Sequence, residues 1–169
     1  MFPIALDLSK IPVLLVGAGE AFVRRKVQLE GAGATKLICR ESFNAYDLEV
    51  VSVVMVAGLA HGEAARVAHE AREAGRLVNV QDVNELCDFY YTAHIRRGDL
   101  LIAVSTNGAS PTLAKRVRDR IATLFDDKWA GYTEAMKEFR LGLKAQGKSM
   151  KAVMAASEKF LDEKGWLKL

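Results

Sequence analysis

Two glycines, Gly17 and Gly19, stand between an apolar run at residues 11–16 and a helical pattern at residues 20–30. A G-x-G that ends a strand and opens a helix is typical of dinucleotide binding, because the first glycine permits a tight turn and the second lets the backbone approach a pyrophosphate. The N–H groups and positive dipole of the helix would meet the phosphate charge. Phe22 replaces the third glycine and is expected to push the helix away from the strand or to lean toward the nucleotide, so a purely structural turn stays an alternative. The predicted cofactor-binding residues of this loop are Gly17, Ala18, Gly19, Glu20, Ala21 and Phe22.

Two charged residues follow the next apolar run, at residues 36–39. Glu41 lies where an acidic residue accepts hydrogen bonds from the adenosine ribose of NAD. Arg40, just before it, would instead suit the 2′-phosphate of NADP. We therefore predict that both residues lie at the cofactor, with NAD preferred and NADP left open.

Asp82 is the predicted catalytic residue. It follows the apolar run at residues 77–80, and ligands of open α/β sheets bind at the carboxyl ends of the strands. Its carboxylate would accept a proton there. The alternative role for an aspartate in this place is to cap a turn. His94 is a secondary candidate as a proton relay or a ligand of a metal ion, and its alternative role is structural.

Polar and basic residues gather further along the chain. Ser105, Thr106 and Asn107 end an apolar run before a glycine, where they would bind a ligand or simply form the turn. The surrounding cations suit an anionic ligand as a cluster, although each alone would fit a solvated helix face. These cations are Arg96, Arg97, Lys115, Arg116, Arg118 and Arg120.

The alternation of apolar runs with amphipathic patterns predicts an α/β fold: a shortened Rossmann-type parallel sheet followed by a helical dimerisation and substrate module. We expect a nucleotide-binding domain at residues 1–110, with a dimerisation segment at about 83–110, and a helical domain at 111–169. Predicted strands span residues 11–16, 36–39, 50–57, 77–80 and 100–104. Predicted helices span residues 20–30, 62–74, 111–125, 129–145 and 149–163.

Composition excludes several classes of protein. Half of the 169 residues are hydrophobic and 27% are charged, which is typical of a globular chain and not of a disordered one. No stretch reaches the roughly 20 apolar residues of a membrane span and no signal peptide is recognisable, so we expect a cytoplasmic protein. The net charge of +3 comes without a recognition helix or a long basic run, which argues against nucleic acid. Cys39 and Cys87 lack zinc-ligand spacing, so we predict unreactive thiols and no metal site.

Two longer blocks carry a family resemblance. They are FPIALDLSKIPVLLVGAGEAFVRRK and VNVQDVNELCDFYYTAHIRRGDLLIAVSTNGASPTLAKRVRDRI, at residues 2–26 and 78–121. The second joins a VN-x-x-D strand end, a C-D-F segment, R-R-G-D-L and S-T-N-G-A-S-P-x-L-A. Together the blocks resemble the bifunctional precorrin-2 dehydrogenase and sirohydrochlorin ferrochelatase family, which includes the amino-terminal module of sirohaem synthases.

The resemblance implies NAD-dependent oxidation of precorrin-2 to sirohydrochlorin, and in this family also Fe²⁺ insertion to give sirohaem. It implies a homodimer that binds the tetrapyrrole in a cleft between the nucleotide domain and the dimer region, with Asp82 matching the aspartate used in both reactions. The chain shows no methyltransferase segment, so another protein is expected to supply precorrin-2. Because precorrin-2 is rich in carboxylates, the predicted substrate-binding residues are Arg96, Arg97, Ser105, Thr106, Asn107, Lys115 and Arg116.

The chain also departs from the family pattern. Phe22 and Thr92 stand where the family has a small residue and a proline, and the segment before Val50 is too short for one strand of the usual Rossmann half. An acidic loop end is replaced by Ala57-Gly58-Leu59-Ala60, from which we keep Ala57 and Gly58 as cofactor contacts.

Several alternatives stay open. The chain would otherwise be an NAD-sensing binding module, or a dehydrogenase without chelatase activity. The candidate residues for a shared apolar dimer surface, which would equally form an internal core, are Trp129, Tyr132, Met136, Phe139 and Leu141.

Overall fold

The computed structural model describes residues 2–167, which form two compact units divided between Tyr91 and Thr92. The compact units divide at Tyr91 because residues 93–104 form a hairpin that packs against the helices that follow it. The boundary of the nucleotide-binding domain at residue 110 stays a prediction. Each unit is therefore described by itself.

The first unit is built on a four-stranded sheet in which every pairing is parallel. The strand order is β2-β1-β3-β4. All residues of β1 and β3 are buried, as expected for apolar strands of a parallel sheet that is covered on both faces. The parallel sheet confirms the predicted α/β fold. The strands are β1 (Val13–Gly17), β2 (Leu37–Arg40), β3 (Val53–Ala57) and β4 (Leu77–Val80).

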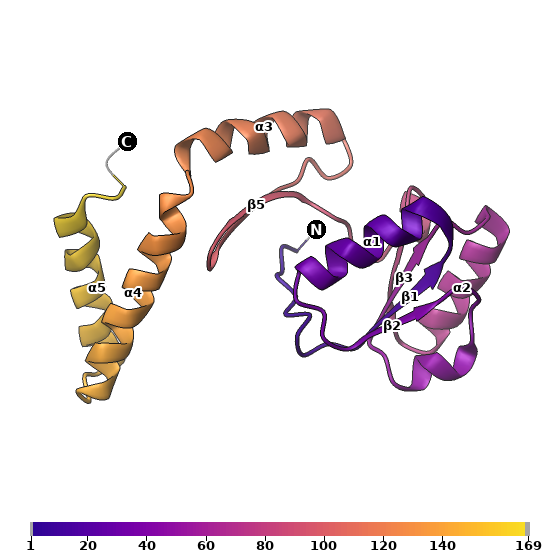
Figure 1. The fold of residues 1–169 in the computed structure, drawn as a ribbon, viewed down its shortest axis with the longest axis horizontal. Coiled ribbons are helices and arrows are strands. Elements are labelled where there is room, and N and C mark those ends of the chain that lie inside the picture. The colour runs from indigo at the N-terminus through magenta and orange to yellow at the C-terminus, as the bar shows by residue number, and fades with distance from the viewer. Residues whose placement is uncertain (1, 168–169) are drawn as a thin grey trace. The chain divides into compact units, whose positions relative to one another are not determined.

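Helices cover both faces of this sheet (Figure 1). Alternate residues of β1 point to opposite faces, so Val13 and Leu15 join the cluster beside α1 (Gly19–Gly31). Leu14 and Val16 join the other cluster, which contains the buried alanines of α2 (His61–Glu73). The helices thereby fix the loops at the carboxyl ends of β1 and β3.

The segment between β2 and β3 is shortened, as the sequence predicted. It contains a single short 3-10 helix, η1 (Ala45–Glu49), where a Rossmann half has another strand. The Asn44 side chain caps η1 by accepting a hydrogen bond from the Tyr46 N–H at 3.1 Å. Leu48 and Val51 join the hydrophobic cluster on the α2 side, so the short segment still contributes to the core.

The outer edge of β4 is covered by residues 87–89, which follow the 3-10 helix η2 (Asn84–Leu86). The Asp88 N–H donates to the Val78 carbonyl at 2.8 Å, and the Val78 N–H donates to the Asp88 carboxylate at 2.8 Å. The buried Asn79 amide donates to the Phe89 carbonyl at 2.9 Å. We call residues 87–89 the edge clamp. Its bonds satisfy polar groups that an open strand edge would leave unpaired.

The Cys87 thiol also belongs to the edge clamp. Its sulfur accepts from the Val80 N–H at 3.3 Å and lies 3.1 Å from the Val80 carbonyl oxygen. Burial raises the pKa of Cys87, and burial likewise raises the pKa of Cys39. Both cysteines are free, and a raised pKa keeps a thiol protonated near neutral pH, which makes it a poor nucleophile.

The second unit begins with an antiparallel hairpin, β5 (Ala93–Arg97) and β6 (Leu100–Val104). The sequence predicted β6 but missed β5. Only Ile95 of β5 is buried, so its short run of charged residues lacked the apolar pattern of a strand. Gly98 makes the turn at a φ of +58°, which favours glycine.

Three helices complete the second unit: α3 (Pro111–Leu124), α4 (Lys128–Ala145) and α5 (Met150–Lys164). Ser110 caps α3, with its Oγ accepting from the Leu113 N–H at 3.1 Å. Aromatic rings join α4 to α5 and to the residues just after it: Phe139 stacks on Phe160, and Tyr132 stacks on Trp166. Tyr132 and Phe139 are half-buried in these stacks, and the choice between a dimer surface and an internal core stays a prediction. Within residues 2–167, no helix has the length and apolar character that crossing a membrane needs.

Candidate functional site

The strand order reverses at β1, because the chain continues to β2 on one side of β1 and to β3 on the other. In open α/β sheets, ligands bind outside the carboxyl ends of the strands at such a switch point. The turns that follow β1 and β3 meet there, with Gly17 in register with Ala57. Three predicted cofactor residues, Gly17, Ala57 and Gly58, therefore lie together.

These two turns are packed backbone to backbone. A Cβ atom on Gly17, whose φ is +143°, would overlap the carbonyl oxygen of Ala57. A Cβ atom on Gly58, whose φ is +77°, would overlap the carbonyl oxygen of Ala18. We call this contact the turn lock. It explains the first glycine of the motif by close packing as well as by the tight turn.

Gly19 differs from Gly17, because a Cβ atom there would meet nothing within 4 Å. Gly19 is the first residue of α1 and has a φ of +71°, and the space beside its backbone is open. The cap residue of α1 is Ala18, and it makes no side-chain hydrogen bond to the first N–H groups. Unsatisfied N–H groups beside open space suit a phosphate group. The loop therefore fits a dinucleotide.

Phe22 points into the protein. Its half-buried ring packs against the hydrophobic cluster on the α1 side, which includes Leu8, Leu15 and Leu29. The sequence had suggested that the ring would displace the helix or lean toward a nucleotide. The Phe22 ring packs into the hydrophobic core instead, so the replacement of the third glycine does not obstruct the Gly17–Gly19 turn.

Arg40 ends β2 in register with Val16 of β1, one residue before Gly17. Its guanidinium forms a two-pronged ion pair with Asp47 of η1: Nε lies 2.9 Å from Oδ2 and Nη2 lies 3.0 Å from Oδ1. Nη1 donates to the Cys39 carbonyl at 3.4 Å. Sequence reasoning missed Asp47, because no local pattern links it to Arg40. Glu41, the predicted ribose ligand, is exposed beside this pair.

Asp82 adopts a backbone conformation that is rare for a residue other than glycine, with a φ of 61° at the carboxyl end of β4. Within residues 2–167, its exposed carboxylate accepts one hydrogen bond, from the Gln81 amide at 3.3 Å, and none from a backbone N–H. The side chain thus does not cap the turn, which was the alternative role. Unusual φ values persist where the surroundings impose them, often at functional sites.

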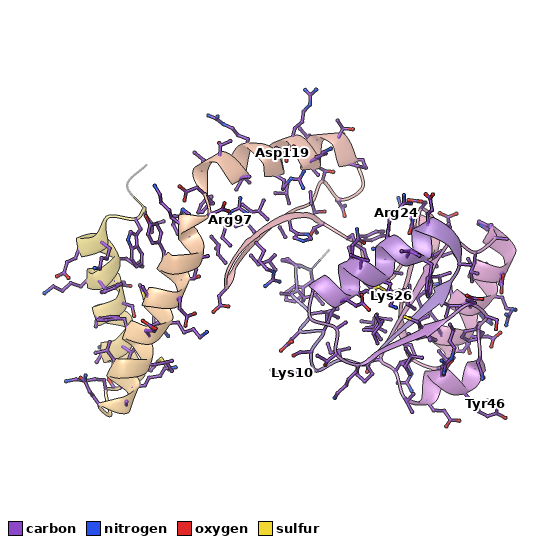
Figure 2. The ribbon with its side chains drawn as sticks, viewed as in Figure 1. Lys10, Arg24, Lys26, Tyr46, Arg97 and Asp119 are labelled. Carbon is purple, nitrogen blue, oxygen red and sulfur yellow. The ribbon has the colours of Figure 1, made fainter. Side chains whose placement is uncertain are left out.

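Arg97, in the second unit, holds β5 to the end of α3 (Figure 2). Its Nε donates to the Phe125 carbonyl at 3.1 Å and lies 3.1 Å from the Asp127 carboxylate, and its Nη1 donates to the Arg96 carbonyl. These contacts give Arg97 a structural role. A substrate role stays a prediction for Arg97 and for the neighbouring cations.

The S-T-N turn uses its hydroxyls internally. Ser105 Oγ accepts from the Asn107 N–H at 3.1 Å, and Thr106 Oγ1 forms two 3.0 Å bonds with the Ser110 backbone. Asn107 is exposed and has a φ of 53°, so it shares its unusual conformation with Asp82. Among the three predicted ligands of this turn, only the Asn107 side chain is left outside these bonds.

Four basic side chains of the second unit, Arg96, Lys115, Arg116 and Arg120, are exposed and form no ion pair with another residue that the structure describes. Arg118, in contrast, pairs with Asp119 at 2.7 Å. His94 is exposed, and its Nδ1 lies 3.1 Å from the Thr92 carbonyl oxygen. Across the described chain, no three His, Cys, Asp or Glu side chains lie close enough to hold a metal ion.

A parallel sheet with a glycine turn at its switch point and an open helix N-terminus defines a Rossmann-type nucleotide-binding domain. Residues 4–93 match the family model described as putative NAD(P)-binding. Residues 97–124 match the model described as the central part of sirohaem biosynthesis proteins. The chain therefore belongs to the family described as putative NAD(P)-binding.

Individual relatives agree with this membership. The siroheme synthase of Methylococcus capsulatus is 35% identical over 82% of this chain and 33% of that protein. Siroheme synthase 1 of Cronobacter sakazakii is 30% identical over 82% of this chain and 34% of that protein. The chain thus spans about a third of the length of the curated relatives it matches. The solved structure of SirC, a precorrin-2 dehydrogenase, shares the fold, with a TM-score of 0.77 at 24% identity over 99% of this chain and 92% of that one.

Proposed function

We propose that this protein oxidises precorrin-2 to sirohydrochlorin with NAD as the hydride acceptor. The observation that carries the proposal is the open backbone at Gly19, where the uncapped N-terminus of α1 meets the switch point of the sheet. The choice of reaction is supported by the similarity to siroheme synthases and to SirC.

Each cofactor-side residue has a separate task. Gly17 and Gly58 shape the turns, Gly19 and the first N–H groups of α1 bind the pyrophosphate, and Glu41 accepts hydrogen bonds from the ribose. When bound, NAD accepts a hydride from the substrate. The turn lock keeps the phosphate-binding backbone in one conformation, so little ordering remains to be done on binding.

The substrate side needs a proton acceptor and positive charge. Oxidation of precorrin-2 by NAD yields sirohydrochlorin, NADH and one proton, and Asp82 receives that proton on its exposed carboxylate. The exposed cations Arg96, Lys115 and Arg116 of the second unit stay predicted ligands of the tetrapyrrole carboxylates. Fe²⁺ insertion, the homodimer, the supply of precorrin-2 by another protein and the cytoplasmic location stay predictions.

An anaerobic assay tests the proposal directly. Precorrin-2 and NAD are mixed with the protein, and absorption spectra are recorded before and after Fe²⁺ is added. We expect sirohydrochlorin to appear together with an equal amount of NADH. Binding of NAD without turnover would favour the NAD-sensing module instead, and a spectrum unchanged by Fe²⁺ would favour a dehydrogenase without chelatase activity.

Gly19→Asp is expected to weaken NAD binding by at least about tenfold, because it places a negative charge where the pyrophosphate meets the backbone. Calorimetry with NAD measures the change. Gly33→Asp is the matched control, since Gly33 also has a positive φ, of +88°, and open space around it. Equal affinities in the two variants would contradict the assignment of the loop.

A further inference from the structure

The segment that replaces the missing strand places a carboxylate against Arg40, a predicted cofactor residue. Asp47 lies in η1, and its side chain is 10% exposed. The 47% exposed Arg40 reaches it from the end of β2. A buried carboxylate that binds an arginine through two oxygens is among the stronger ion pairs in proteins. The pair therefore joins a nearly buried carboxylate to a half-exposed guanidinium.

Arg40 occupies the strand end at which Rossmann domains distinguish NAD from NADP. An arginine there binds a 2′-phosphate when its two-pronged face is free. In this chain the Nε and Nη2 edge already binds Asp47, and Nη1 donates to the Cys39 carbonyl. The repulsion between Asp47 and a phosphate also offsets the attraction that Arg40 would exert on it.

We infer that Asp47 is a specificity-determining residue that makes the site prefer NAD to NADP by occupying Arg40. The inference rests on the proposed function, because it needs a dinucleotide at the Gly17–Gly19 loop. It explains how an arginine at this position is compatible with NAD. It also assigns the segment between β2 and β3 a role in cofactor specificity in addition to its contribution to the core.

The test is the affinity of the protein for NAD and for NADP, measured by calorimetry. Wild-type protein is expected to bind NADP at least about tenfold more weakly than NAD. Asp47→Ala is expected to raise the NADP affinity by about tenfold and to leave the NAD affinity within about threefold. Glu49→Ala is the matched control, since it removes an exposed carboxylate from the same short helix.

Asp47→Ala combined with Arg40→Gln separates release of Arg40 from a general loss of negative charge. The double variant is expected to lose the gain in NADP affinity. If Asp47→Ala does not fold, Asp47→Asn keeps the volume and removes the charge, so the same comparison applies.

The outcomes separate the inference from the proposed function. An unchanged NADP to NAD ratio in a folded Asp47 variant, or a wild-type protein that prefers NADP, would overturn the inference alone. Wild-type protein that binds neither dinucleotide would overturn the proposed cofactor and the inference with it.

Discussion

Replacing Asp82 with asparagine is expected to slow the oxidation of precorrin-2 by about 10²- to 10⁴-fold, the usual contribution of a general base. Asparagine tolerates the left-handed φ of 61° about as well as aspartate does, so the backbone stays in place. Only the proton-accepting charge is lost. Steady-state kinetics under anaerobic conditions measure the effect, and NAD affinity is expected to stay the same.

Asp82→Gly provides the control for backbone strain. Glycine adopts a positive φ without cost, so this variant is expected to be at least as stable as the wild type while it turns over as slowly as Asp82→Asn. Thermal unfolding of both variants shows whether any loss of activity comes from the fold. Wild-type turnover in folded Asp82→Asn would remove Asp82 from the mechanism and make Asn107 and His94 the next residues to test.

The largest effect on stability is expected from Gly17→Ala. The new methyl group would overlap the Ala57 carbonyl oxygen, and alanine also resists a φ of +143°. Strain and overpacking each cost about 1 to 3 kcal/mol, so the free energy of unfolding is expected to fall by about 2 to 6 kcal/mol. Urea unfolding followed by circular dichroism measures it.

Gly33→Ala serves as the comparison for Gly17→Ala. Gly33 has a φ of +88° but open surroundings, so this variant bears only the conformational cost, of about 1 to 2 kcal/mol. The excess loss in Gly17→Ala reports the turn lock. Equal losses of unfolding free energy in the two variants would mean that the turns after β1 and β3 can move apart. That result would contradict a rigid phosphate-binding loop.

Local sequence patterns predicted the first unit well, because its strands are apolar runs buried on both faces. The same patterns failed where structure depends on distant partners. β5 has one buried residue and becomes a strand only by pairing with β6. The hairpin then groups with α3 and α4, which moves the boundary between the units to Tyr91.

The candidate site divides in the same way. The Gly17–Gly19 turn was predictable, since a tight turn and an exposed backbone both require glycine at fixed spacing. The bond between Arg40 and Asp47 could not be predicted, because the path of the chain between them has no local sequence pattern. Nor could the sequence show that the Arg97 guanidinium binds the Phe125 carbonyl and the Asp127 carboxylate. The sequence around a basic residue does not reveal which distant groups it will contact.

The edge clamp has a consequence for the chain during its synthesis. β4 presents its outer edge as soon as it pairs with β3, but Asp88 and Phe89 follow several residues later in the sequence. Until they emerge, that strand edge is a template on which another nascent chain can add a strand. A substitution of Asp88 is therefore expected to lower the yield of folded protein, because more chains aggregate during synthesis. The molecules that do fold would retain an intact switch point.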